Sequence, residues 1–201
     1  MNTIIHDPSL PGLATLLEPQ LLMKTLHSLN AMPVLSKAQI TYIKYKPATN
    51  CLVGYQFGTD TSLFDGYARA LRHDAYASVQ GHASQGCIQL DQQALELRFF
   101  PYDRRLPRLR VLADAQRKRA LLKRLFPEQP EWWHGHLERL AYKPERRYVA
   151  RLVVGHQPLA VLKFHTPDAY VAARRAATVS YTHLRAHETD SYLVCRLLLE
   201  K

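Results

Sequence analysis

The chain has 201 residues, 47% hydrophobic and 22% charged, which is the balance of an ordinary soluble globular protein with one domain or two small ones. Its net charge of +10 permits binding to nucleic acid, to nucleotide phosphates or to an anionic surface, and does not choose among them. No run approaches the ~18 apolar residues of a membrane span, no secretory signal is visible, and the cysteines have neither metal nor disulfide spacing. We therefore expect a cytoplasmic protein.

The first half of the chain predicts a helical cap followed by an antiparallel β unit. Leucines near a 3.6-residue period over residues 8–36 predict helix, and we assign residues 1–36 to the cap. The β unit is placed at residues 37–110, with a turn at residues 46–50 and a short helix over residues 73–80. Its strands are predicted at residues 40–46, 51–57, 66–71, 87–90 and 94–100.

A basic segment and a second β unit make up the rest. Prolines on either side of Arg104-Arg105 predict an ordered loop, and residues 111–126 predict a basic helix within a connector over residues 111–134. The second β unit is placed at residues 135–178, where Thr166 and Pro167 predict the start of a helix. Its strands are predicted at residues 137–142, 148–154 and 159–164.

The two β units read as copies of one another. When Tyr45-Lys46-Pro47 is aligned with Tyr142-Lys143-Pro144, the order of strand, turn, strand, loop and strand recurs. In this alignment Arg69 of the first copy falls at the position of Lys163 in the second. The sequence therefore predicts one supersecondary unit used twice, with a cation late in each third strand.

Lys163 is the residue that points most directly to chemistry. It follows Val161 and Leu162 in an apolar strand, and an ammonium group buried there needs an anionic partner. In kinase-like folds, nucleotide phosphates are that partner, and a turn between the first two strands covers them. Here that turn, residues 143–147, contains no glycine, so Arg146 and Arg147 would supply charge instead. The alternative is that Lys163 lies on an outward face and extends to solvent.

Three stretches together resemble the N-terminal part of aminoglycoside phosphotransferase-type proteins, which belong to the kinase-like phosphotransferases. They read FPYDRRLPRLRVL, LERLAYKPERRYVARL and LAVLKFHTPDAY, and the resemblance covers residues 38–177, most strongly residues 98–170. It implies an α+β fold, a protein-kinase-like N-lobe with duplicated antiparallel units, truncated before the C-lobe. It also implies ATP and Mg²⁺ as cofactors of the full-length protein. The expected cofactor-binding residues are Lys163, Arg146, Arg147 and Lys143.

The same resemblance implies groups that this chain lacks. No glutamate that could pair with the lysine appears in residues 169–178, so this partner is missing or lay beyond the end of native sequence. No motif here matches the catalytic aspartate or the metal ligands of the family. We therefore expect no catalytic and no metal residue. The chain is interpreted as an inactive N-terminal fragment of an ATP-dependent small-molecule hydroxyl kinase. Its expected partners are a nucleotide and a small-molecule acceptor, with no membrane and nucleic acid disfavoured. The alternative is a non-catalytic basic module for an anionic partner such as nucleic acid.

Residues 179–201 resemble a translated sequencing adapter. Residues 179–189 read VSYTHLRAHET and residues 193–201 read LVCRLLLEK, and the codons that the two joins require fit Thr178 and Tyr192. The alternative is a short amphipathic helix. On the adapter interpretation native sequence ends at residue 177 or 178, and four residues that look like metal or catalytic candidates are discarded: His183, His187, Glu188 and Cys195.

Two other clusters carry weaker signals. His134, His136 and Glu138 have side chains that could ligate a metal, but they lie in a connector rich in aromatic residues. His73-Asp74 resembles part of a kinase catalytic motif, but it precedes the lysine strand and lacks a following asparagine. We interpret both clusters as structural or surface features.

Overall fold

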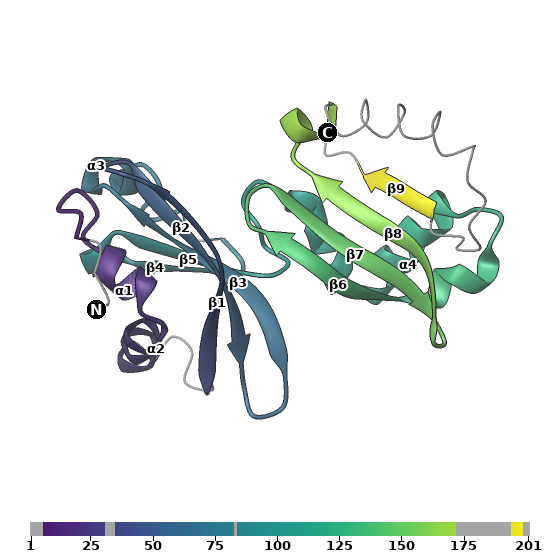
Figure 1. Ribbon diagram of the computed structural model, residues 1–201, viewed down its shortest axis with the longest axis horizontal. Helices are drawn as coiled ribbons and strands as arrows, with labels where there is room; N and C mark the ends of the chain where they lie inside the picture. The colour runs from purple at the N-terminus through teal and green to yellow at the C-terminus, as the bar shows by residue number, and fades with distance from the viewer. Residues whose placement is uncertain (1–5, 31–34, 83, 172–193, 199–201) are drawn as a thin grey trace. The chain divides into compact units, whose positions relative to one another are not determined.

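The computed structural model describes residues 6–30, 35–82, 84–171 and 194–198, and its fold class is α+β with antiparallel sheets (Figure 1). The chain divides into two compact units, residues 1–102 and residues 103–201. Each unit contains one sheet, and each is described separately below. No helix in the described part of the chain is long and apolar enough to cross a membrane.

The first unit is built on a five-stranded antiparallel sheet. The strands lie in the order β1-β2-β3-β5-β4, and a short helix, α3 (His73–Ala77), leads from β3 toward β4. The strands are β1 (Lys37–Lys46), β2 (Asn50–Gly58), β3 (Leu63–Leu71), β4 (Cys87–Leu90) and β5 (Leu95–Phe99). The strand and turn predictions for this unit are confirmed, because alternating side chains and Gly/Pro/Asn turns mark these strands clearly.

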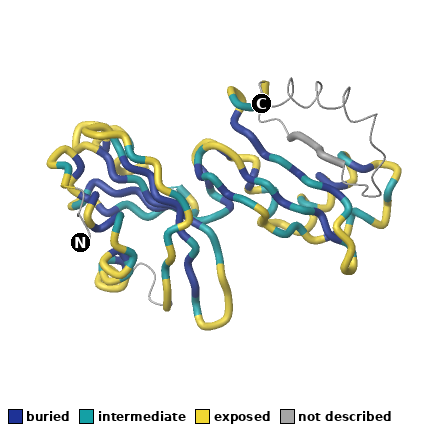
Figure 2. Tube along the Cα trace, viewed as in Figure 1, coloured by how far each residue is buried: buried dark blue, intermediate teal, exposed yellow. Residues whose placement is uncertain are grey.

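Two helices pack their leucines against the first sheet. They are α1 (Leu13–Leu17) and α2 (Pro19–Ser28), and the prediction of a helical segment over residues 8–36 is too long at its C-terminal end. Pro19 separates the two helices because proline fits only at the start of a helix. The helix leucines share one buried core with the inner residues of β2, as the dark segments of Figure 2 illustrate.

The second unit places a helical segment before a three-stranded antiparallel meander. The helical elements are η2 (Pro107–Ala113), α4 (Ala115–Leu125) and η3 (Pro130–His134). The strands are β6 (His136–Lys143), β7 (Arg147–Val154) and β8 (Gln157–His165). The α-helix predicted over residues 111–126 begins four residues later than expected, because the Asp114 side chain accepts a hydrogen bond from the Arg117 N–H and caps α4 there.

A further strand, β9 (Val194–Leu198), runs parallel to β8 at the edge of the second sheet. It lies within the stretch that resembles translated adapter. An exposed edge strand offers unpaired backbone groups to any extended segment, so this pairing does not decide the origin of residues 194–198. Residues 167–171 begin the predicted helix after β8. The remainder of that helix and the discarded candidates His183, His187 and Glu188 lie outside the described residues.

Candidate anion-binding site

The two faces of the second sheet differ in chemistry. On one face Tyr142, Tyr148 and Phe164 are paired across β6, β7 and β8, and all three are buried. Their rings meet edge to face, with centroids 6.0 Å apart in the first pair and 5.9 Å apart in the second. Because successive residues of a strand point to opposite faces, the neighbours of these aromatic residues must lie on the other face.

That other face carries the cations. Lys143, Arg147 and His165 are paired with one another across the three strands, and Lys163 is paired with Val149 in the next row. Directly paired residues share a face, so these four side chains lie on the same side of the sheet. We call this set, Lys143, Arg147, Lys163 and His165, the cationic face.

The structure therefore brings together three of the four predicted cofactor-binding residues. Lys143 and Lys163 are half-buried on the cationic face, and Arg147 is exposed beside them. Arg146 does not belong to this face, because it lies in the turn between β6 and β7, where it is exposed. Its backbone N–H donates to the Lys143 carbonyl at 3.1 Å, which closes the turn.

His165 is a residue of this face that sequence reasoning missed. It is 8% exposed, and among the described residues its Nε2 is buried without a hydrogen-bond partner. Burial lowers the pKa of this imidazole, and the positive charges of Arg147 and Lys163 lower that pKa further. The neutral form of the ring is therefore favoured over the protonated form, and a buried polar atom without a partner needs an explanation. The signal in the sequence was the position of His165, two residues after Lys163.

Lys163 has no ion-pair partner among the described residues. The glutamate that the family resemblance calls for is absent from residues 169–178, and the structure supplies no substitute carboxylate within the described residues. Lys163, half-buried and without a carboxylate partner among the described residues, lies beside the exposed Arg147 and the buried His165. Such a cluster favours an anion with several acceptor oxygens.

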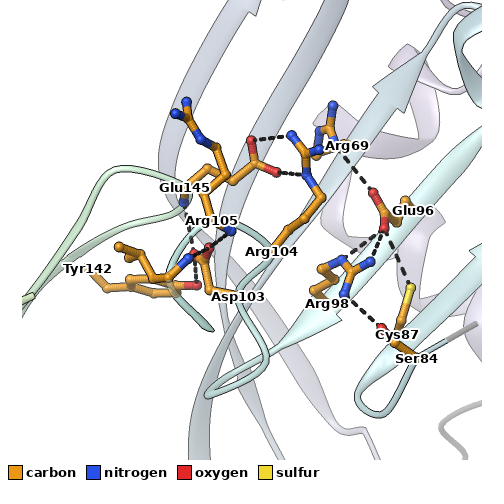
Figure 3. A network of polar contacts seen from close by, with 11 residues as sticks. Arg69, Ser84, Cys87, Glu96, Arg98, Asp103, Arg104, Arg105, Tyr142 and Glu145 are labelled. Atoms are coloured by element: carbon orange, nitrogen blue, oxygen red, sulfur yellow. Dashed lines mark hydrogen bonds and ion pairs between the residues drawn. The ribbon is translucent and has the colours of Figure 1, made fainter. Parts of the chain in front are cut away.

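Asp103 fixes the turn between β6 and β7, whose two ends are Lys143 and Arg147 (Figure 3). One oxygen of its buried carboxylate accepts hydrogen bonds from the Tyr142 hydroxyl at 2.8 Å and from the Glu145 N–H at 2.9 Å. The other oxygen accepts from the N–H groups of Arg105 and Leu106, at 2.8 Å and 3.0 Å. Four donors on one carboxylate hold the turn firmly against the loop that begins the second unit.

The turn itself contains a strained residue that a second contact supports. Glu145 has φ of +57°, a conformation that side chains with a Cβ rarely adopt. Its carboxylate receives the Arg104 guanidinium, with Nε to Oε1 at 2.9 Å. Because Glu145 neutralises Arg104, neither residue adds free charge to the cationic face.

The first unit repeats this construction at the positions that the alignment predicts. Asp7 accepts hydrogen bonds from the Tyr45 hydroxyl and the Ala48 N–H, both at 2.8 Å, and Ala48 also has a positive φ, +51°. Both aspartates begin the same short pattern, Asp-x-x-Leu-Pro, at residues 7–11 and 103–107. We call each arrangement of aspartate, tyrosine hydroxyl and turn N–H a turn clasp. The shared pattern was visible in the sequence but was not used there.

The strand register confirms the predicted equivalence of Arg69 and Lys163. Arg69 is paired with Leu52 and Lys163 with Val149, and the turn alignment matches those two partners as well. The surroundings differ, however. Arg69 forms an ion pair with Glu96 of β5 at 3.3 Å, and Glu96 also accepts from Arg98 Nε at 2.8 Å (Figure 3).

The weaker candidates are engaged in surface contacts. The Glu138 carboxylate receives two donors from Arg151, at 2.9 Å and 2.6 Å, and contacts His136 Nε2 at 3.1 Å. The hydrogen bonds from Arg151 and His136 lower the pKa of Glu138. Asp74 is paired with Arg72 on the surface. Within the described residues, no three His, Cys, Asp or Glu side chains are grouped so that they could hold a metal ion.

Comparisons with models of protein families, with curated proteins and with solved structures found no match to this chain. The resemblance to aminoglycoside phosphotransferase-type proteins therefore stays a prediction from the sequence.

Proposed function

We propose that this chain is the N-terminal part of an ATP-dependent phosphotransferase that acts on a hydroxyl group of a small molecule, and that its cationic face holds the nucleotide phosphates. The observation that carries the proposal is the grouping of Lys163, Arg147 and Lys143 beside the unpartnered Nε2 of His165. Lysine on the third strand of an antiparallel sheet is the residue that kinase-like folds use on nucleotide phosphates.

The residues fit a phosphate group chemically. Lys163 supplies an ammonium point charge and Arg147 a guanidinium, and both bind phosphate oxygens well. His165, when its Nε2 carries the proton, donates a neutral hydrogen bond to the same oxygens. The clasp by Asp103 holds the turn in place before the ligand arrives, which lowers the ordering cost of binding.

The proposal assigns no residue of this chain to Mg²⁺ or to proton abstraction. Mg²⁺ in such sites is bound by one or two carboxylates and by the substrate phosphates. In the described part of the chain, Asp103 is engaged by the β6–β7 turn, and Glu145 within that turn is engaged by Arg104. We therefore expect ATP binding without phosphotransfer from the 201-residue chain.

Calorimetric titration of the whole chain with ATP tests this proposal. We expect Lys163→Ala to weaken ATP binding by at least about tenfold. Lys44→Ala, which removes an exposed strand lysine of the first unit, is the matched control and should leave the affinity within about twofold. Equal affinities for the two variants would contradict the proposal, and so would transfer of phosphate to any acceptor by this chain.

A second candidate is a basic module that binds nucleic acid through α4, which exposes Arg117, Arg119 and Arg124. Titration with a DNA duplex at about 50 mM and about 200 mM salt separates the two functions. Binding that falls steeply with salt and does not depend on Lys163 would favour the nucleic-acid function. We expect DNA to bind more weakly than ATP at the higher salt, because exposed arginines bind backbone phosphates through charge and salt weakens that attraction steeply.

A further inference from the structure

A second region of the second unit gathers positive charge around an apolar hollow. It lies between η2, α4 and the residues that follow β8, and has a volume of about 860 Å³. Cavities of about 300–1,000 Å³ are the size that small-molecule ligands occupy. We call it the arginine groove. The described residues that line it are Pro107, Arg108, Arg110, Val111, Arg117, Ala120, Leu121, Arg124, Phe164 and Tyr170.

The helix α4 presents one stripe of residues to this groove. Arg117, Ala120, Leu121 and Arg124 are spaced at i, i+3, i+4 and i+7, which places them on one side of the helix. The small Ala120 side chain keeps the middle of the stripe open, and an arginine stands at each end. The groove wall is therefore apolar in the middle and cationic at the rim.

Two of the arginines that line the groove, Arg117 and Arg124, have no counter-charge among the described residues. Four arginines line it, and no aspartate or glutamate is among the described lining residues. Arg117 and Arg124 are exposed, and neither guanidinium meets a carboxylate among the described residues. Two other arginines of the unit do meet carboxylates, Arg104 that of Glu145 and Arg105 that of Asp168.

The groove is distinct from the cationic face. Phe164 lines the groove, and it lies on the aromatic face of the sheet, opposite the face that carries Lys163. A ligand in the groove would contact α4 and the aromatic side, and a ligand on the cationic face would contact the β6–β7 turn. The two sites can therefore be tested independently.

We propose that the arginine groove binds an organic phosphate with an apolar body. Guanidinium groups bind phosphate oxygens in pairs, and Arg117 and Arg124 at the two ends of the α4 stripe suit a group that carries two negative charges. Val111, Leu121 and Tyr170 provide apolar contact for the body of the molecule. Inorganic phosphate alone would contact the arginines at the rim and make no contact with these apolar residues.

Titration of the whole chain with 1-naphthyl phosphate, inorganic phosphate and 1-naphthol tests the proposal. We expect naphthyl phosphate to bind more tightly than either of the others by at least about tenfold, because only it uses both rim and wall. The double variant Arg117→Gln/Arg124→Gln should lose at least about tenfold in affinity for it. Arg119→Gln, an exposed arginine of the same helix outside the groove lining, is the matched control and should change affinity less than about twofold.

Two further variants secure the interpretation. Ala120→Glu places a carboxylate in the middle of the stripe at an exposed helical position, and should weaken binding without disturbing α4. Lys163→Ala, on the cationic face, should weaken naphthyl phosphate binding less than Arg117→Gln/Arg124→Gln does, and a larger loss from Lys163→Ala would overturn the proposal. Equal binding of naphthyl phosphate and inorganic phosphate would overturn the proposal, as would a double variant that binds like the Arg119→Gln control.

Discussion

The two units place a cation at the same point of the same strand, but they neutralise it differently. Arg69 on β3 meets Glu96, because β5 lies beside β3 and brings a carboxylate that is 1% exposed. Lys163 on β8 has no carboxylate partner among the described residues. A desolvated cation needs a counter-charge. The first unit supplies its own, and under the proposed function nucleotide phosphates supply it in the second.

The turns of the two units show the same contrast in a milder form. Both are held by an aspartate that accepts from a tyrosine hydroxyl and from the N–H of a residue with positive φ. The first turn has the sequence Lys-Pro-Ala-Thr-Asn and the second Lys-Pro-Glu-Arg-Arg. The same clasp therefore supports a turn with one lysine in the first unit and a turn with one lysine, two arginines and one glutamate in the second. The scaffold is therefore shared between the two units, and the proposed function places its ligand on the second unit alone.

The largest effect is expected from Glu96→Gln. Arg69 and Arg98 would both lose their shared counter-charge, and breaking a buried ion pair from one side destabilises by about 3–5 kcal/mol. Denaturant unfolding, followed by a probe in the first unit, measures this change. Glu138→Gln, which removes an exposed partner of Arg151, is the control and should have little effect. Similar losses for the two variants would mean that the first unit does not depend on its internal counter-charge.

Removing the two clasp aspartates should come next in size. Asp103→Ala leaves four donors without their acceptor in a buried setting, which we expect to cost about 3 kcal/mol. Asp7→Ala should cost much less, because Asp7 is less buried and water replaces it. Thermal unfolding of both variants measures the difference. If Asp7→Ala proved as damaging as Asp103→Ala, burial would not be what distinguishes the clasps.

Much of the fold was predictable because its signals are local. Alternating strands and the two Lys-Pro turns gave the β meanders, and one alignment correctly placed Arg69 opposite Lys163 in the repeat. Three of the four predicted cofactor-binding residues share a face because side chains alternate along a strand, and residues 143, 147 and 163 fall at positions that point to the same side. The face that each strand residue takes can be predicted from the sequence once the position of the turn is known.

The contacts that were missed join residues far apart in the chain. Asp103 lies 39 residues before Tyr142, and Asp7 lies 38 residues before Tyr45, so no local pattern connects either pair. The pairing of Glu96 with Arg69 depends on β5 lying between β3 and β4 in the sheet. That strand order is set by the topology of the sheet and not by a local sequence pattern. The start of α4 was misplaced for a simpler reason. A basic run was read as one helix although Asp114 is a good N-cap.

A smaller effect is expected at the residues with positive φ. Ala48→Gly should stabilise the first turn by about 0.5–1 kcal/mol, because glycine adopts this conformation without steric cost. Glu145→Gly should gain less or lose stability, since it also removes the ion pair with Arg104. Urea midpoints of the two variants give the comparison. A larger gain at residue 145 would show that the Arg104 contact contributes nothing to the second turn.

The smallest effect is a difference in pH dependence. Hydrogen bonds from the Ala48 N–H and the Tyr45 hydroxyl lower the pKa of Asp7 below 3.8, so its contribution to stability is present above that pH and lost as pH falls through the folded-state pKa. Burial raises the pKa of Asp103 above 3.8, so as pH falls the folded state binds a proton at Asp103 before the unfolded state does. The free energy of unfolding therefore decreases as pH rises from 3.8 through the folded-state pKa of Asp103. Asp7→Asn and Asp103→Asn should therefore change the slope of unfolding free energy against pH near 4 in opposite directions. Slopes that change in the same direction would refute this assignment.

The comparison of the two units is tested most directly by recording backbone amide NMR signals of the ¹⁵N-labelled chain during titration with ATP. The account predicts that the signals of Arg146, Arg147 and Lys163 shift together with increasing ATP. The equivalent signals of Thr49, Asn50 and Arg69 should stay in place, because Glu96 already supplies the counter-charge of Arg69. Shifts of equal size in both sets, or shifts confined to the first unit, would contradict the claim that only the second unit leaves its strand cation open to an anionic ligand.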